Sequence, residues 1–367
     1  MSIPNPNTRD LSRLPKAELH LHLEGAMRPS TLKDLCRKYS METPTIPTIT
    51  SNSRFQDFSS FVDIYVAACT VLRREEDIHR LVLEVAQDLK ECHVIYAEIA
   101  PSFTFYSQPY FGSSMEDTLR VLVDAASIAE RDTGVMINYV VSVERHLGTD
   151  DAMKLAHLAR KGATGMKING RPAVVGFGLH GPEEGHPPRP FKEAFDVACT
   201  PCSKDDNDDD DYGVTIASLP HAGEIAPSPS TCTGAKSVLD AVQILNAKRI
   251  AHGVLANDDA QAMQILKERD VVCDMGITSN FLLNVVESRK EHPITTFLKE
   301  GIKCTINSDD PLLFGCNILS EYQLCRDVLE MDDFTIAQCA KTSFQYSCAP
   351  EDLKSRGVKG VDEWLST

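Results

Sequence analysis

The feature that most constrains the fold of this chain is a regular alternation of short apolar segments and longer amphipathic ones. Eight segments rich in β-branched and apolar residues are predicted strands: residues 17–22, 94–99, 136–142, 173–179, 214–220, 249–254, 271–277 and 302–307. Apolar residues recur at helical spacing between most of them, over residues 75–91, 115–131, 149–161, 234–246 and 258–269. Strands that alternate with helices lie parallel, so the chain is predicted to be α/β, a (β/α)8 TIM-type barrel.

Two stretches exceed this regular period. Residues 28–90 are too many for one helix, so extra helices are predicted to be inserted after strand 1. An insertion there lies over the barrel mouth, and Phe58 or Phe61 could face a ligand, although aromatic residues at this spacing more often belong to a core. Residues 317–367 predict C-terminal helices outside the barrel. We therefore expect a single barrel domain over residues 1–367.

The charge balance limits the partners of the chain. It has 53 acidic and 37 basic residues and a formal net charge of -16. An acidic loop is predicted at about residues 203–212, where Asp205 to Asp211 is interrupted only by Asn207. This balance disfavours nucleic acid and anionic membranes, and no run of about 18 apolar residues is present. Scattered cysteines, and no signal-like apolar core in residues 1–10, favour a cytoplasmic protein with a small-molecule ligand. The oligomeric state is left open.

Histidines and one aspartate follow several of the predicted strands. His20 and His22 end the first strand and point the same way, because side chains in a strand alternate between its two faces. His221 follows the fifth strand, and Asp309 follows the eighth. Residues just past the carboxyl ends of barrel strands converge on one mouth, and strand eight adjoins strand one. A single ion can therefore be surrounded by four side chains: His20, His22, His221 and Asp309.

Three imidazoles and one carboxylate are a ligand set that suits Zn²⁺, and an open position for water makes such a site catalytic. The metal lowers the pKa of its water from about 15.7 to roughly 7, which produces hydroxide near neutral pH. Hydroxide attacks an electrophilic carbon. We therefore expect one Zn²⁺ per chain and a hydrolytic reaction.

Five motifs, in this order, resemble those of the adenosine/adenine deaminase family. They are Pro-Lys-Ala-Glu-Leu-His-Leu-His-Leu-Glu-Gly at 15–25, Pro-His-Ala-Gly-Glu at 220–224, Arg-Ile-Ala-His-Gly at 249–253, Thr-Ser-Asn at 278–280 and Asn-Ser-Asp-Asp-Pro at 307–311. The bulk of the chain is most similar to bacterial-type adenosine deaminases. The resemblance implies a mononuclear zinc site and attack of hydroxide on carbon 6 of a purine, with loss of ammonia or an amine.

The resemblance also implies the catalytic roles. Glu224 matches the acid that protonates ring nitrogen 1, a role that needs a raised carboxyl pKa, as a dry pocket would provide. His252 matches the residue that orients the hydroxide and stabilises its charge. The zinc ligands are matched by the four side chains that the strand ends bring together: His20, His22, His221 and Asp309.

Further positions match residues that contact the substrate. Asp310 matches the group that bonds ring nitrogen 7, and Gly181 matches the glycine whose backbone amide reaches ring nitrogen 3. Glu24 and His22 are also expected at the substrate. Ser279 matches a residue that does not touch the metal but contacts the ligand Asp309 and orients it.

The segment after the fourth predicted strand departs from the family pattern. Residues 176–184 read Gly-Phe-Gly-Leu-His-Gly-Pro-Glu-Glu in place of the Asp-Leu-Ala-Gly-Asp-Glu type, and His180 is either a substrate contact or a solvent-facing residue. The next four residues, 185–188, are more similar to adenine deaminases. We favour adenosine or deoxyadenosine, converted to inosine-type products. Adenine and N6-methylated adenine nucleosides or nucleotides remain the alternatives.

Two other classes of protein were weighed. A two-metal hydrolase would usually need a carboxylated lysine at the end of the fourth strand, and that strand ends Gly178-Leu179-His180. A non-catalytic purine-binding barrel would have no need of Glu224 and His252 beside four metal ligands. The sequence therefore favours a one-zinc enzyme of purine metabolism.

Overall fold

The strands form one parallel sheet. The computed structural model describes residues 9–367 apart from 47–48, 50–52, 107–113, 202–213 and 226–233, so the predicted acidic loop lies outside the described residues. The sheet order is β1-β2-β3-β6-β7-β8-β9-β10, and every pair is parallel. Its strands are β1 (Lys16–His22), β2 (Val94–Ala100), β3 (Met136–Glu144), β6 (Val174–His180), β7 (Ala217–Ala222), β8 (Arg249–His252), β9 (Val272–Met275) and β10 (Cys304–Ile306). Each overlaps one of the eight predicted strands, which confirms the predicted fold class.

The sheet closes between its first and last strands. Leu21 and Asp309 form a parallel bridge just beyond β10. The backbone N–H of His22 donates to the carbonyl of Asp309 at 3.0 Å, and the N–H of Asp309 donates to the carbonyl of His20 at 3.1 Å. Closure of the barrel therefore brings Asp309 beside the two histidines of β1.

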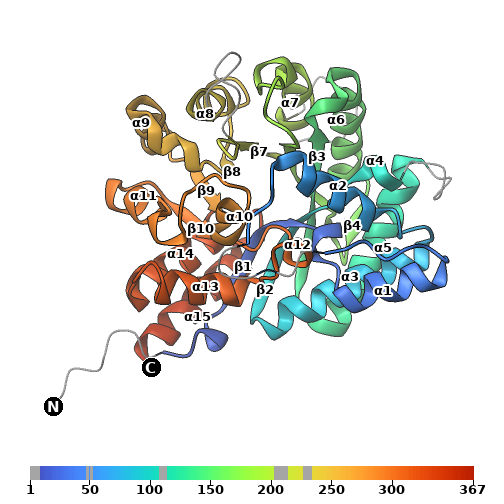
Figure 1. The fold of residues 1–367 in the computed structure, drawn as a ribbon, viewed down its shortest axis with the longest axis horizontal. Helices are drawn as coiled ribbons and strands as arrows, with labels where there is room; N and C mark the ends of the chain where they lie inside the picture. The colour runs from blue at the N-terminus through green and yellow to red at the C-terminus, as the bar shows by residue number, and fades with distance from the viewer. Residues whose placement is uncertain (1–8, 47–48, 50–52, 107–113, 202–213, 226–233) are drawn as a thin grey trace.

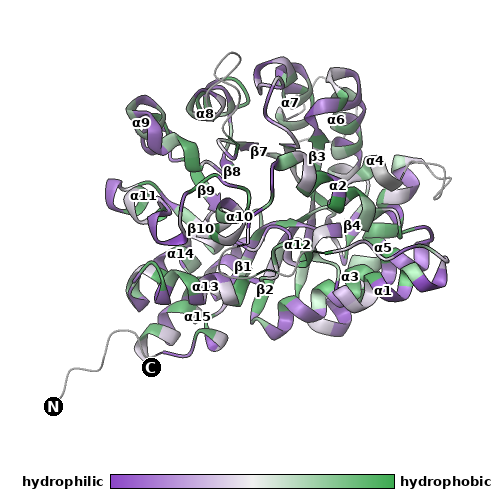
Figure 2. Cartoon of the chain, in the orientation of Figure 1, coloured by the Kyte–Doolittle hydropathy of each residue, from purple (hydrophilic) through white to green (hydrophobic). Residues whose placement is uncertain are grey.

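Helices surround these strands (Figure 1). Those between strands are α4 (Phe103–Tyr106), α5 (Met115–Thr133), α6 (Thr149–Thr164), α7 (Lys192–Cys199), α8 (Gly234–Gln243), α9 (Ala260–Glu268), α10 (Ile277–Leu282) and α11 (Ile294–Glu300). After β10 come α12 (Pro311–Phe314), α13 (Ile318–Asp327), α14 (Asp333–Gln345) and α15 (Glu351–Ser366). The helices carry both hydrophilic and hydrophobic residues, as an amphipathic layer around a buried sheet must (Figure 2). Among the described residues, no helix combines the length and apolar character needed to cross a membrane.

One small element was not predicted. β4 (Lys167–Ile168) and β5 (Arg171–Pro172) form an antiparallel pair outside the barrel. The turn between them is Asn169-Gly170, with φ of 46° and 89°. Asn-Gly is the sequence that a two-residue hairpin turn with positive φ favours, so the signal was present in the sequence.

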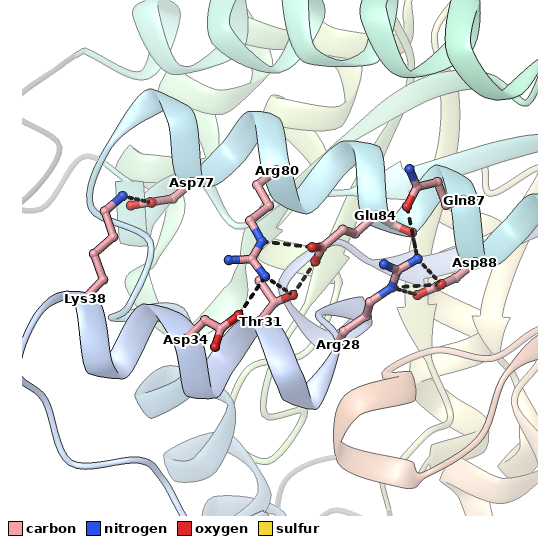
Figure 3. A network of polar contacts seen from close by, with 9 residues as sticks. All are labelled: Arg28, Thr31, Asp34, Lys38, Asp77, Arg80, Glu84, Gln87 and Asp88. Atoms are coloured by element: carbon pink, nitrogen blue, oxygen red, sulfur yellow. Dashed lines mark hydrogen bonds and ion pairs between the residues drawn. The ribbon is translucent and has the colours of Figure 1, made fainter.

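The insertion between β1 and β2 holds α1 (Pro29–Lys38), α2 (Phe58–Cys69) and α3 (Glu75–Glu91). Side-chain contacts fix α1 and the residue before it against α3 (Figure 3). Arg28 Nε donates to Asp88 at 2.9 Å, and Arg80 of α3 lies 3.1 Å from Asp34 of α1. Thr31 also donates to Glu84. These contacts anchor the ends of the insertion, while α2 lies across the barrel mouth.

Candidate active site

Four side chains from three parts of the barrel meet at the carboxyl ends of the strands. Nε2 of His221 lies 3.1 Å from Nε2 of His20 and 3.3 Å from Nε2 of His22. Oδ1 of Asp309 lies 3.2 Å from Nε2 of His20 and 3.4 Å from Nε2 of His22. All four residues are less than a tenth exposed. The structure therefore brings together the side chains that the sequence predicted as ligands.

These atoms fit a divalent metal ion. At the zinc–nitrogen distance of about 2.0–2.1 Å, the corners of a tetrahedron are roughly 3.4 Å apart. The separations of 3.1–3.4 Å given by the four atoms are close to that value. Nδ1 of His20 lies 3.1 Å from the carbonyl of Asp274, so it can donate there and leave the Nε2 lone pair free. Imidazole nitrogens and a carboxylate oxygen gathered in this way could hold a metal ion.

Asp309 and His252 occupy unusual backbone conformations. Their φ angles are 60° and 67°, in the left-handed region that residues other than glycine rarely adopt. Such conformations persist only where the surrounding structure holds them, and they cluster at functional sites. Here they occur at His252, the last residue of β8, and at Asp309, shortly after the end of β10.

A hydrogen-bond relay defines the state of His252. The amide oxygen of Asn280 lies 3.0 Å from Nε2 of His292, and its amide nitrogen lies 3.0 Å from Nδ1 of His252. With His292 donating to Asn280, the amide donates to Nδ1 of His252, and this orientation is assigned from the network. Burial lowers the pKa of His252 to about 3, so the ring is neutral and carries its hydrogen on Nε2.

Nε2 of His252 lies near the carboxyl groups of Glu224 and Asp309. It lies 3.4 Å from Oε1 of Glu224 and 3.8 Å from Oδ2 of Asp309, and it has no hydrogen-bond partner among the described residues. A nitrogen that carries hydrogen is a donor and not a metal ligand. A ring nitrogen of His252 also lies within 4.8 Å of donor atoms of His20, His221 and Asp309, so the hydrogen assigned to Nε2, and not its distance, distinguishes His252 from the other three histidines.

Glu224 is held by a residue that the sequence did not single out. Its side chain is buried, and burial together with the nearby carboxylates of Asp309 and Glu183 raises its pKa well above the ordinary range. The carboxylate of Glu183 accepts the backbone N–H groups of Gly223 at 3.0 Å, Glu224 at 2.9 Å and Ile225 at 2.9 Å. It also accepts the hydroxyl of Ser237 at 2.6 Å. A single buried carboxylate therefore fixes the loop that carries Glu224.

Asp310 lines the same cavity as Glu224 and Asp309. Burial and the charge of Asp309 raise the pKa of Asp310 well above its usual range, and its Oδ1 has no hydrogen-bond partner among the described residues. A protonated carboxyl can donate a hydrogen bond to a ring nitrogen. Gly25 makes room for it, because a Cβ at that position would lie 1.7 Å from Oδ1 of Asp310.

The remaining predicted residues differ in their placement. Gly181, with φ of 90°, lines the same cavity as Asp310. Glu24 does not line it: its carboxylate accepts the Tyr65 hydroxyl at 2.7 Å and the Ser102 backbone N–H at 3.1 Å. Ser279 is buried near Asp309, but its hydroxyl has no hydrogen-bond partner among the described residues. The predicted support of Asp309 by Ser279 is thus not present as a hydrogen bond.

The cavity has a volume of about 300 Å³ and reaches from the ligand cluster to the insertion. Phe58 and Phe61 of α2 both line it, and His180 lines it while stacking on His22, with ring centroids 5.3 Å apart. A larger cavity of about 490 Å³ lies at the other end of the strands, where Val174 begins β6. It contains none of the clustered residues, so chemistry belongs to the smaller cavity.

Comparison with known proteins gives the family. The model of the family described as adenosine deaminase matches residues 15–364. The chain belongs to the adenosine deaminase family. A Streptomyces virginiae protein, provisionally named adenosine/adenine deaminase, is 33% identical over 98% of this chain and 99% of its own length. An aminodeoxyfutalosine deaminase of Streptomyces avermitilis is 31% identical over 97% of this chain and 92% of its own length.

Solved structures agree with this family. The adenine deaminase of Arthrobacter aurescens has a TM-score of 0.81 and 26% identity, covering 96% of this chain and all of that one. An amidohydrolase from Burkholderia ambifaria, solved with bound Zn, has a TM-score of 0.78 and 21% identity, covering 97% of this chain and 93% of that one. The adenosine deaminase family thus includes relatives named for several adenine-type substrates, and the resemblance drawn from the motifs is confirmed.

Proposed function

We propose that this chain is a zinc-dependent aminohydrolase that replaces the amino group at carbon 6 of an adenine-type purine, with adenosine or deoxyadenosine as its substrate. The observation that carries the proposal is the convergence of four side chains that could hold a metal, a buried acid and a neutral imidazole at one cavity, which His22, His221, Asp309 and Glu224 line. Residues 1–367 would form one catalytic domain that binds one Zn²⁺ per chain.

The metal would be held by His20, His22, His221 and Asp309. When bound, Zn²⁺ supplies a Lewis acid that makes water acidic enough to react near neutral pH. His252 donates its Nε2 hydrogen toward the incoming oxygen, and so orients it and stabilises its charge. These positions are consistent with the 3.4 Å and 3.8 Å distances from this nitrogen to Glu224 and Asp309.

Glu224 supplies a proton to ring nitrogen 1 of the purine. A carboxyl whose pKa is raised keeps its proton at neutral pH, which this role requires. Protonation of the ring withdraws electrons from carbon 6 and makes it open to attack. Asp310, also protonated, donates to ring nitrogen 7, and the backbone N–H of Gly181 donates to ring nitrogen 3. The hydroxyl added at carbon 6 loses its proton as it becomes a carbonyl, and this proton passes to the amino group, which leaves as ammonia.

Adenine is the second candidate substrate. The Arthrobacter aurescens relative is named an adenine deaminase, and Glu24 is engaged by Tyr65 and Ser102 and does not reach the cavity. A free base needs no group that recognises a sugar. The catalytic roles proposed for Glu224 and His252 would be the same.

The test is the ultraviolet absorbance change of zinc-loaded protein with adenosine, adenine, N6-methyladenosine and AMP, each offered separately. Fast turnover of adenosine supports the proposal. Turnover of adenine alone would assign the second candidate, and silence with all four purines in protein that contains zinc would refute deamination.

A further inference from the structure

The cavity contains a buried carboxylate for which the proposed reaction has no use. Glu144 is the last residue of β3; it is 7% exposed and lines the cavity. Ser102 donates its hydroxyl to Glu144, and Thr104 donates as well. Burial raises the pKa of Glu144, while these two hydroxyl donors favour its ionised form. An acid buried at this position lowers stability unless a partner or a ligand compensates for it.

Glu144 ends β3, a strand that contributes no side chain to the ligand cluster. The arc β2-β3-β6 lies between β1, which carries His20 and His22, and β7, which carries His221, while Asp309 follows β10 after two further residues. Glu144 pairs in register with His180 of β6, and both line the cavity. His180 also stacks on His22 of the cluster, so these two residues reach from the cluster to the end of β3. A purine whose carbon 6 lies at the cluster can therefore present its opposite edge, which carries nitrogen 9, toward Glu144.

His180 is a second polar group of the cavity, and it lies between the ligand cluster and Glu144. Its side chain is 8% exposed, and Nε2 has no hydrogen-bond partner among the described residues. The wall opposite is apolar: Phe58, Phe61 and Val62 of α2 line it. A buried polar atom without a partner next to an open cavity is the kind of group that a ligand satisfies.

The cavity has acidic side chains but no lysine or arginine among the described residues that line it. Glu144, Glu224, Asp309 and Asp310 line it, with Glu224 and Asp310 in the protonated form that the proposed reaction uses. The nearby Arg145 is fully buried and donates to the carbonyls of His186 and His221 at 3.0 Å and 2.8 Å. Within the part of the chain that the structure describes, no lysine or arginine side chain lining the cavity is thus available to pair with a phosphate or a carboxylate on the substrate.

We propose that Glu144 and His180 form a binding subsite for a neutral, hydroxyl-bearing substituent on nitrogen 9, and that Glu144 excludes purines whose substituent is anionic. The carboxylate accepts a sugar hydroxyl, and His180 Nε2 makes a second hydrogen bond to the substituent. An unpaired anion placed beside a buried carboxylate is strongly disfavoured. The subsite rests on the proposed deamination and narrows its substrates to nucleosides, against both the free base and the nucleotide.

The test compares kcat/KM for adenine, adenosine and AMP in zinc-loaded wild type, Glu144→Gln and Ser102→Ala. Glu268→Gln, on the exposed surface of α9, is a control with the same change in charge. The wild type is expected to prefer adenosine to AMP at least about a hundredfold, and Glu144→Gln to reduce that preference at least about tenfold. Ser102→Ala should change the preference in the same direction by a smaller factor, and Glu268→Gln should not change it.

The outcomes separate this inference from the proposed function. Equal turnover of adenosine and adenine, or of adenosine and AMP, would overturn the subsite and leave deamination intact. If Glu144→Gln folds with the same urea midpoint as the wild type and still shows the same preference for adenosine over AMP, that result would overturn the role of Glu144. If Glu144→Gln does not fold, the shift in Ser102→Ala decides in its place. Failure to turn over any purine would overturn both proposals.

Discussion

Replacing Glu183 should damage both stability and turnover, because this residue holds the loop of Glu224. Its carboxylate is 2% exposed and accepts three consecutive backbone N–H groups and one hydroxyl, at 2.6–3.0 Å. The change to alanine leaves three N–H groups without an acceptor, those of Gly223 and Glu224, which are buried, and that of Ile225, which is half-buried. The change to glutamine keeps the shape but removes the charge and turns an NH₂ group toward one of these donors.

The size of the expected loss in stability follows from these hydrogen bonds. Each buried donor left unsatisfied costs about 1–3 kcal/mol, and hydrogen bonds to a charged group lie toward the upper part of that range. The three losses are not additive, since water can enter the space left by the side chain and satisfy some of the donors. We expect Glu183→Ala to lower the free energy of unfolding by about 3–5 kcal/mol, a large part of the roughly 5–15 kcal/mol that stabilises a typical domain.

Turnover should fall for a separate reason. A displacement of about 1 Å in a catalytic group can cost about a hundredfold in rate, so kcat should fall more than KM rises, in Glu183→Gln as well as Glu183→Ala. The assays are urea unfolding and steady-state kinetics of zinc-loaded protein. Glu184→Ala is the matched control, because Glu184 is the exposed neighbour of Glu183. A loss of less than about 1 kcal/mol, no larger than that of the control, would refute this reasoning.

Three further changes test the reacting groups and the pH dependence. Glu224→Gln should leave folding and zinc content nearly unchanged and lower kcat at least about a hundredfold, and unchanged kcat would remove Glu224 from the mechanism. His221→Ala should lose most of the bound zinc by elemental analysis, so stoichiometric zinc would contradict the ligand set. Burial raises the pKa of Glu321 from 4.5 to about 7, so its favourable contribution is complete below pH 4.5 and is lost as the pH rises through 7. Glu321→Gln should therefore gain up to about 3 kcal/mol relative to wild type between about pH 5 and pH 8 in urea unfolding, and a pH-independent difference would count against it.

A fourth change tests the tautomer of His252. Asn280→Asp replaces the amide donor with a carboxylate acceptor, which would draw the ring hydrogen of His252 to Nδ1 and leave Nε2 without one. Activity should then fall at least about tenfold while zinc content stays the same. The ¹⁵N chemical shift typical of a protonated ring nitrogen should move from Nε2 to Nδ1 of His252. Shifts identical to those of the wild type would show that the hydrogen bonds from Asn280 do not set the tautomer.

Much of the fold could be read from the sequence because its signals are local. The eight strand segments and the helices between them follow from apolar periodicity, and a parallel α/β alternation leaves few topologies. The β4–β5 hairpin was missed because its strands are two residues long and show no alternation, although Asn169-Gly170 marked the turn. The sequence also determined which residues lie at strand ends, and therefore that His20, His22, His221 and Asp309 would share one mouth.

Only the tertiary structure decided what each of these groups contacts. Glu183 lies next to Glu184 in an ordinary polar loop, and nothing local shows that its carboxylate reaches three backbone groups of residues 223–225. Glu24 matches a substrate-binding position, yet Tyr65 from the insertion engages it. Contacts between residues far apart in the chain depend on barrel closure and on rotamers, which leave no periodic trace in the sequence. The position of a residue at a strand end determines where its backbone lies, and the packing of the folded barrel determines its side-chain rotamer and contacts.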